Sequence, residues 1–397
     1  MNIFEFLKST PALYKMVILS RAYQQECKAR KELNYYRKIA EQRGIAVPAG
    51  ETLISLLKRR LKGRGISPTQ KEKGSLHIFL VFGINNWEAV LPLALSPFGH
   101  VTTFSWQTGG FFDRYNKWLK WRNDLNADIL DTFKKAHSEQ PVDIMVGYLS
   151  DFNTTKETLI EIGKNGVTIF NMCWDDKLYF NASNVKGQPR SLKGIVSAVD
   201  LNLTNAPDSC IKYLIEGGLS MFWAEAAHPD IYKPYDLPFE FDVSFIGSKS
   251  VHREKLVNHL RKMGIKVATF GKGWRNGLLP EDEMVKLFSR SRISLGYAGV
   301  GYSDKLMCLK GRDFEVPMSG GLYLTQDNPE LALVYKVGRE IVTYKDENDC
   351  VRKIRWLLDN PEHAEKIRKA GQERTLKEHT WEKRFLDIFM LTGVLRN

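Results

Sequence analysis

The stretch Lys305-Leu-Met-Cys-Leu-Lys310-Gly-Arg312-Asp-Phe-Glu315-Val-Pro-Met-Ser-Gly320-Gly321-Leu-Tyr-Leu-Thr325 places fixed charges and a glycine pair between two apolar segments. Its last four residues form a short apolar run that is typical of a buried parallel strand, and Gly320-Gly321 predicts the turn that leads into it. Pro317 suits the first turn of a short helix, because the N–H that proline lacks would be unpaired there anyway. We therefore expect a helix, a tight turn and a parallel strand.

Charged residues gather near the start of the expected helix. Lys310 and Arg312 lie beside an N-terminus whose N–H groups and dipole favour an anion such as a phosphate. Glu315 would repel a phosphate, so a pair of vicinal hydroxyls, such as a ribose diol, suits it better. A surface ion pair between Glu315 and its basic neighbours is the alternative interpretation.

The run from Lys310 to Gly321 resembles the donor-site segment of GT-B glycosyltransferases, in particular the bacterial group that includes spore-maturation-type glycosyltransferases. The resemblance extends from about Asp242 to Phe385. Its further landmarks, in order along the chain, are Phe245-Ile-Gly247-Ser with Arg253, Phe270-Gly-Lys272-Gly-Trp274, Gly338-Arg-Glu340-Ile-Val and His379-Thr-Trp381. The resemblance implies an α/β protein of the GT-B class, with two Rossmann-like domains facing a central cleft, and a nucleotide-sugar-dependent glycosyltransferase.

In that family the residue matching Glu315 binds the ribose of the nucleotide sugar. Retaining relatives with a paired-glutamate motif carry a first Glu eight residues earlier, where this chain has Met307. The choice between inverting and retaining transfer therefore stays open. The same difference permits a second hypothesis, a nucleotide- or glycan-binding protein without catalysis.

Length and composition predict a multidomain globular protein. The 397 residues are 43% apolar and 11% aromatic, which is enough for two or three cores. The five cysteines form no Cys-x-x-Cys pair and indicate reduced thiols without a structural zinc. Met16–Leu19 is too short for a signal-peptide core, and no apolar run approaches the roughly 20 residues that span a bilayer. We expect a cytoplasmic protein, peripheral at the inner face of the membrane.

The positive charge is concentrated at the start of the chain. Residues 1–74 hold 16 Lys and Arg against 6 Asp and Glu, or +10 of the net +12. Apolar spacing predicts helices here, and the second one combines Leu53, Leu57 and Leu61 with basic residues. Such a helix can lie on an anionic membrane; packing on the protein with its charges in water is the alternative. Nucleic-acid binding through the extension is disfavoured, because the rest of the chain is nearly neutral.

Beyond residue 74, short apolar runs alternate with helical stretches, a pattern that predicts parallel sheets wound on both faces. The expected strands are 76–82, 101–104, 142–146, 167–170 and 195–203, then 243–246, 265–270, 293–295, 322–325 and 341–343. Prolines at 229, 234 and 238 predict a linker. We divide the chain into a basic helical extension, an acceptor domain, a linker, a donor domain and a C-terminal helix crossing back to the acceptor domain, at residues 1–74, 75–228, 229–241, 242–379 and 380–397.

Loops at the carboxyl ends of parallel strands are the expected place for a binding site. Charge grows on the diphosphate when a sugar leaves, and fixed cations can stabilise it. The donor half has no Asp-x-Asp cluster, so we expect a metal-independent enzyme with no cofactor other than its nucleotide-sugar co-substrate. The expected donor-binding residues are glycines, cations and polar or aromatic side chains of these loops: Gly247, Ser248, Arg253, Lys272, Trp274, Tyr297, Lys305, Lys310, Arg312 and Glu315.

The acceptor, a glycan or lipid-linked hydroxyl, is expected near Asn85, Asn86 and Trp87, which follow the first strand; a capped helix start is the alternative. Inverting transfer also needs a base to take the acceptor proton. The candidates at strand ends and before the linker are Asp151, Asp176 and His228. Each of the two aspartates has an alternative as a helix cap or salt-bridge partner.

Overall fold

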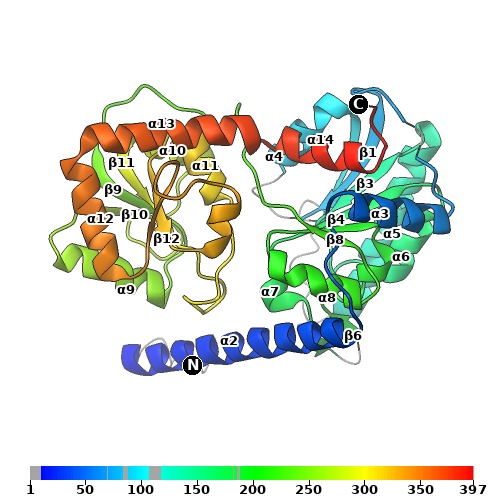
Figure 1. Cartoon of the computed structure of the whole chain (residues 1–397), viewed down its shortest axis with the longest axis horizontal. Helices are drawn as coiled ribbons and strands as arrows, with labels where there is room; N and C mark the ends of the chain where they lie inside the picture. Colours follow the sequence, from blue (N-terminus) through cyan, green and yellow to red (C-terminus); the bar gives the residue numbers. More distant parts are fainter. Residues whose placement is uncertain are drawn as a thin grey trace. The chain divides into compact units, whose positions relative to one another are not determined.

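A computed structural model describes residues 10–68, 70–83, 88–106, 118–181, 183–185 and 188–396 (Figure 1). The chain divides by its internal contacts into two compact units, which we describe separately. The five-stranded unit holds residues 1–30 and 225–380, and the six-stranded unit holds residues 31–224 and 381–397. The sequence from 1 to 74, expected as one extension, is thus shared between the two units.

The six-stranded unit is built on a parallel sheet of order β2-β1-β3-β4-β7-β8. Strand β1 is buried along its whole length, as its unbroken apolar run predicts. The strands are β1 (Leu76–Phe82), β2 (Gly99–Ser105), β3 (Ile144–Gly147), β4 (Thr168–Cys173), β7 (Leu201–Thr204) and β8 (Ser220–Phe222), with an antiparallel pair, β5 (Ser183–Val185) and β6 (Gln188–Arg190). The helices are α4 (Val90–Leu95), α5 (Trp118–Glu139), α6 (Lys156–Gly163), α7 (Asp176–Tyr179), α8 (Cys210–Ile215) and α14 (Trp381–Leu391), with 3-10 turns at Ser96–Phe98, Val196–Ala198 and Pro207–Ser209.

One expected strand is shorter than predicted. The apolar run 195–203 becomes a 3-10 turn followed by β7, because Asp200 interrupts it. The Asp200 carboxylate accepts a 2.8 Å hydrogen bond from Ile169 N. This backbone N–H is therefore paired with a side chain at the point where the expected strand is interrupted.

The five-stranded unit has a parallel sheet of order β10-β9-β11-β12-β13. Its strands are β9 (Phe241–Ile246), β10 (Val267–Phe270), β11 (Ser291–Leu295), β12 (Tyr323–Gln326) and β13 (Val342–Tyr344). Its helices are α9 (Val251–Lys262), α10 (Glu281–Arg290), α11 (Arg312–Met318), α12 (Glu347–Asp359) and α13 (Pro361–Glu378), with a 3-10 turn at Pro329–Leu333. The core joins strand residues such as Val243, Leu295 and Leu324 to helix residues such as Leu260 and Ile354.

The expectation that Pro317 lies in the first turn of its helix is wrong. Helix α11 begins at Arg312, so Pro317 lies in its last turn. Proline there cannot donate to the carbonyl of Asp313. That carbonyl accepts a 2.9 Å hydrogen bond from the Tyr335 hydroxyl, which supplies the missing donor.

The chain begins with two helices, α2 (Pro11–Gln42) and α3 (Gly50–Gly63). Helix α3 buries Leu53, Leu57 and Leu61 within the six-stranded unit. The alternative of a helix packed on the protein therefore applies to α3, whose apolar side is unavailable to a membrane. None of the described helices is long and apolar enough to span a bilayer.

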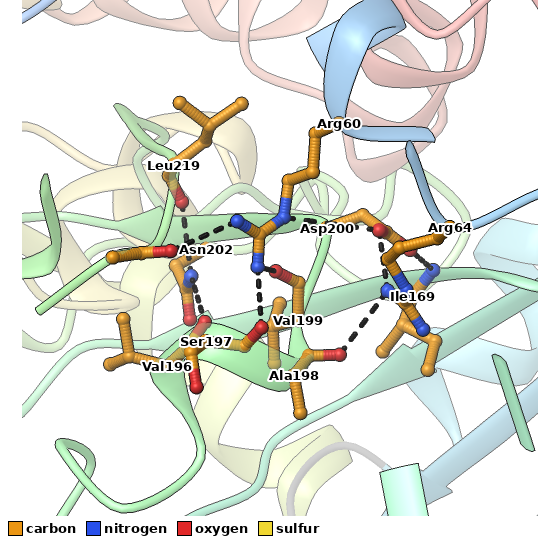
Figure 2. Close-up of polar contacts among 11 residues, drawn as sticks. Arg60, Arg64, Ile169, Val196, Ser197, Ala198, Val199, Asp200, Asn202 and Leu219 are labelled. Atoms are coloured by element: carbon orange, nitrogen blue, oxygen red, sulfur yellow. Dashed lines mark hydrogen bonds and ion pairs between the residues drawn. The ribbon is translucent and has the colours of Figure 1, made fainter. Parts of the chain in front are cut away.

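Arg60 of α3 and Arg64, the residue after its end, are turned into the protein (Figure 2). Arg60 donates to the carbonyls of Ser197 and Val199 at 2.6 and 2.8 Å. Arg64 pairs with Asp200 at 2.5 Å, and Asp200 has no solvent exposure. Part of the basic charge that suggested a membrane or nucleic-acid surface is therefore used to hold α3 on the sheet.

Candidate functional site

Three loops meet at the carboxyl edge of the five-stranded sheet. Strands β10, β9 and β11 are parallel neighbours, so the loops that follow them, at 247–250, 271–274 and 296–305, leave the same edge. Helix α11 precedes β12, which is also parallel to β11, so α11 begins at this edge as well. The sheet topology therefore collects the expected donor-binding segments.

Arg253, in the first turn of α9, is a partly buried cation at this edge. Its guanidinium lies 5.4 Å from the Tyr297 ring centroid and 5.9 Å from that of Phe245. It donates to the Ser248 carbonyl at 2.9 Å. No carboxylate pairs with it among the residues that the structure describes. Burial lowers the pKa of Arg253, but arginine stays charged at neutral pH. A partly buried cation without a counter-charge suits an anionic ligand.

Glycine is required where the β9 and β10 loops meet. A Cβ on Gly271 would lie 2.4 Å from the Gly247 carbonyl oxygen, at a φ of +123°. The Trp274 indole N–H donates to that same oxygen at 2.9 Å. Trp274 is 9% exposed and belongs to the core. The indole is therefore a support for the loop, and the part expected of Trp274 in donor binding stays a prediction.

The neighbouring polar residues of these loops lie at the surface. Ser248 and Lys272 are exposed. Lys249, the residue after Ser248, lies 5.7 Å from the Trp274 ring and pairs with Glu254 at 2.6 Å. Lys272 is thus the better placed of the two lysines for a ligand, because no described carboxylate neutralises it.

The loop after β11 folds back on itself and carries Lys305. Gly299 pairs with Met307 in an antiparallel bridge, and Lys305 at the turn is exposed. The Ser303 hydroxyl accepts hydrogen bonds from the Lys305 and Leu306 amides at 3.0 and 2.8 Å, which fixes the turn. Met307, where some relatives carry a carboxylate, therefore occupies a structural position in this loop.

Helix α2 holds the same turn from outside. Gln25 accepts a 2.9 Å hydrogen bond from the Tyr302 amide. Glu26 accepts a 2.5 Å hydrogen bond from the Ser303 hydroxyl. Arg21 reaches the Tyr302 hydroxyl at 3.2 Å. The first part of α2 is thus a component of the five-stranded unit, which the basic composition of the extension gave no means of predicting.

A second charged pair in this region, His252 with Asp304, was also missed. Their side chains approach to 3.3 Å. The hydrogen bond to Asp304 raises the pKa of His252 and, through the same bond, lowers the pKa of Asp304. Because His252 lies beside Arg253 in sequence, a spacing search for cations near the Phe-Ile-Gly-Ser motif could have found it.

Arg312 and Glu315 form an ion pair one turn apart on α11, as the surface-pair alternative anticipated. The Arg312 guanidinium also lies 2.9 Å from Met284 Sδ and 5.9 Å from the Phe288 ring. Burial lowers the pKa of Arg312. The guanidinium is therefore turned toward α10, and Glu315 has only 12% of its side chain exposed.

Glu225 joins this cluster and was not predicted. A Cβ on Gly311 would lie 2.9 Å from Glu315 Oε1 and 3.3 Å from Glu225 Oε2, so both carboxylates crowd the same glycine. Glu225 is 8% exposed. Nothing in the local pattern Trp-Ala-Glu-Ala-Ala marks this residue, since only the fold brings it to α11.

Lys310 contacts residues that lie close to it in the sequence. Its amide donates to Asp313 Oδ2 at 2.7 Å, and its ammonium lies 3.1 Å from Cys308 Sγ. Burial raises the pKa of Asp313 to about 7. The Asp313 carboxylate thus fixes a residue that precedes the helix start.

The two aspartates proposed as bases lie in the six-stranded unit and are buried. Asp176 has no exposure; its carboxylate accepts hydrogen bonds from the Thr204 and Tyr213 hydroxyls at 2.5 and 2.9 Å. Burial raises its pKa to about 6. Asp151 pairs with Arg122, and burial raises its pKa to about 6. These surroundings fit structural carboxylates, as the salt-bridge alternative supposed.

His228 belongs to the five-stranded unit and is 8% exposed. Its Nδ1 accepts a 3.3 Å hydrogen bond from the Asp230 amide, and its carbonyl caps the turn at Ile231 and Tyr232. A role in proton transfer stays a prediction. Asn85, Asn86 and Trp87, the expected acceptor residues, lie outside the described residues.

Comparison with known proteins agrees with this architecture. Residues 252–389 match a family described as Glycosyl transferase-like. No curated protein matches the chain. Sucrose-phosphate synthase (tll1590) from Thermosynechococcus elongatus is 12% identical with a TM-score of 0.54, over 80% of this chain and 98% of that one.

Two further structures share the fold. Anabaena Alr3699/HepE in complex with UDP-glucose is 12% identical with a TM-score of 0.52, over 88% of this chain and 98% of that one. A putative UDP-N-acetylglucosamine 2-epimerase from Listeria monocytogenes is 10% identical with a TM-score of 0.50, over 80% and 95% of the two chains. At such identities the likeness concerns the fold. The predicted GT-B class, with two parallel α/β sheets and a helical N-terminal extension, is confirmed.

Proposed function

We propose that this protein is a glycosyltransferase that binds a nucleotide-sugar donor at the carboxyl edge of the five-stranded sheet. The observation that carries the proposal is Arg253, held between two aromatic rings without a carboxylate partner among the described residues. Exposed Lys272 and Lys305 lie on neighbouring loops of that edge. The Glycosyl transferase-like match over residues 252–389 covers the same segment. Solved relatives of this fold hold UDP or UDP-glucose.

The mechanism follows from where charge develops. When the bond between the sugar and the diphosphate breaks, negative charge grows on the leaving oxygens, and preoriented cations lower that barrier. Arg253 is preoriented by its rings, while Lys272 and Lys305 supply mobile charge. We propose that these cations act without a metal ion. Glu315, held by Arg312, is proposed to accept hydrogen bonds from the ribose hydroxyls.

The finer points of the proposal rest on the sequence. We propose an acceptor that is a glycan or lipid-linked hydroxyl, and a place among spore-maturation-type enzymes of the cell envelope. We further propose that the protein works in the cytoplasm, peripheral at the inner membrane face through residues 1–74. The catalytic base is left to experiment, with Asp151, Asp176 and His228 as the candidates; all three are buried.

The test is release of nucleoside diphosphate by the purified full chain. UDP-glucose is the first donor to try, followed by other nucleotide sugars in a thermal-shift screen. We expect slow donor hydrolysis that Arg253→Gln reduces and that the exposed-site control Arg275→Gln leaves unchanged. Donor binding without any turnover would favour the second hypothesis, a binding protein without catalysis. Interconversion of sugar epimers without an acceptor would indicate the activity named for the Listeria relative. No binding of any nucleotide sugar would refute the proposal.

A further inference from the structure

The solvent-facing side of α2 carries a row of apolar side chains. Leu13, Met16, Leu19 and Tyr23 expose 38%, 68%, 45% and 67% of their surfaces. Residues three or four apart share one side of a helix, so these four form one row of about 15 Å. Single exposed apolar residues are ordinary, but a contiguous apolar patch marks an interaction surface.

Basic residues accompany this row. Of the acidic residues of the helix, Glu26 and Glu32 are bonded to other parts of the protein, and exposed Glu41 lies near the far end. Lys15 and Arg30 are exposed, and exposed Lys31, Arg37 and Lys38 continue the charge along the helix. Glu26 bonds to Ser303 at 2.5 Å. Glu32 bonds to Lys212 at 2.8 Å.

Between Thr10 and Ala40, every position being described, Glu26 and Glu32 are the only acidic residues, and neither is exposed. The outward side of α2 is therefore apolar and cationic.

We propose that this side of α2, the outer face formed by Leu13, Lys15, Met16, Leu19, Tyr23 and Arg30, docks on an anionic lipid surface. The inference gives a specific site to the peripheral membrane contact of the proposed function and rests on it. It also moves that contact away from α3, whose amphipathic pattern suggested it first. Helix α3 buries its leucines and directs Arg60 and Arg64 inward.

The combination of groups identifies lipid as the occupant. A helix lying in a membrane interface needs apolar side chains to enter the headgroup region and cations to meet anionic lipids. Nucleic acid would use the cations but would leave Leu13, Met16 and Leu19 without favourable contacts. A protein partner would have to present acidic residues around an apolar patch. A membrane of anionic lipids offers the same combination of negative charge and apolar interior, and it needs no specific sequence to do so.

The experiment is co-sedimentation of the full chain with vesicles. One set is phosphatidylcholine alone, and the other contains about one-third phosphatidylglycerol, so that only headgroup charge differs. The test variant is Met16→Ser with Leu19→Ser and Tyr23→Ser. Gln24→Ser, exposed on the same helix, controls for the helix propensity of serine, and Leu278→Ser controls for loss of an exposed apolar side chain elsewhere. A second variant, Lys15→Glu with Arg30→Glu, tests the charge.

We expect binding to the anionic vesicles only, weakened by salt, with at least a tenfold loss of partitioning in both α2 variants and wild-type behaviour in both controls. Circular dichroism and nucleotide binding without vesicles should match the wild type in every variant, which separates this surface from the donor site. Equal binding of the α2 variants and the wild type would overturn the proposal. The proposal would also be overturned if the wild type formed an oligomer that dissociates in the triple variant, or if the chain bound DNA as tightly as it binds vesicles.

Discussion

The two units differ in whether some of the charged residues that follow their strands are paired with an opposite charge. In the six-stranded unit, Asp151 and Asp176 follow strands as catalytic carboxylates often do, yet each is buried with a partner from its own unit. In the five-stranded unit, Arg253 and Lys305 also follow strands, but they have no carboxylate partner among the described residues. The proposed donor site therefore rests on charges after strands that no described carboxylate pairs with.

The largest effect should come from breaking an internal pair of the six-stranded unit. Asp200→Ala would leave Arg60 and Arg64 facing each other without their shared carboxylate. We expect a loss of about 3 kcal/mol in the free energy of unfolding, because removal of one buried partner leaves an uncompensated charge. Urea denaturation measures it, with exposed Asp359→Ala as the control. A change no larger than the control's would mean that this cluster does not hold α3.

Arg253→Gln tests the opposite behaviour in the five-stranded unit. We expect nucleoside diphosphate affinity to fall by about two orders of magnitude, which corresponds to roughly 3 kcal/mol for charge-assisted hydrogen bonds. The free energy of unfolding should change little, since no internal carboxylate loses a partner. Calorimetric titration measures the affinity and urea denaturation measures the free energy of unfolding, each beside Arg275→Gln. Unchanged affinity would exclude Arg253 from the site.

Glu315→Ala tests whether a carboxylate in an ion pair can also serve a ligand. We expect the dissociation constant of the donor to rise by one to two orders of magnitude, roughly 1.5–3 kcal/mol. The sharper form is a double-mutant cycle that pairs the variant with a nucleotide lacking its ribose hydroxyls. If the variant and the deoxy ligand have additive effects, Glu315 does not contact the ribose and only holds Arg312.

The buried carboxylate of Asp176 should leave a signature in the pH dependence of stability. Its pKa rises from 3.8 to about 6 in the folded protein, so the native state holds the proton more tightly than the unfolded chain. The resulting stabilisation is complete below pH 3.8 and is lost as the pH rises through 6, at about 3 kcal/mol in total. Asp176→Asn should flatten the unfolding free energy over this range. An unaltered slope would mean that other groups cause it.

The smallest effect concerns the loop held by α2. Gln25→Ala removes the acceptor of the Tyr302 amide and should cost about 1 kcal/mol, seen as a several-fold higher KM for the donor with little change in kcat. Gln24→Ala, exposed beside it, is the matched control. A fall in kcat alone would contradict a positioning role through Lys305.

The strands and most helices were predictable because their signals are local. The apolar run Leu76–Phe82 is a buried strand, as expected. The errors arose where a distant residue decides the outcome. The Tyr335 hydroxyl bonds to the carbonyl that Pro317 cannot reach in the last turn of α11. The Asp200 carboxylate bonds to Ile169 N and interrupts the expected strand before β7.

The loops of the candidate site were predictable from the sequence, but the hydrogen bonds and contacts between its side chains were not. Trp274 faces the core because Gly247 offers its carbonyl to the indole, and no spacing rule reveals that partner. Glu225 reaches Gly311 only through the fold. The partners of the N-terminal charges were equally hidden, since Arg60 of α3 bonds to carbonyls of the six-stranded unit and Glu26 of α2 bonds to Ser303.

The measurement closest to the central claim is titration of the full chain with UDP and with uridine, each with and without a metal chelator. We predict that the diphosphate strengthens binding by about a hundredfold over uridine, the 2.7 kcal/mol expected of several charge-assisted hydrogen bonds, and that the chelator leaves this gain intact. Equal affinities for UDP and uridine, or a gain that the chelator abolishes, would contradict a site in which fixed cations hold the phosphates.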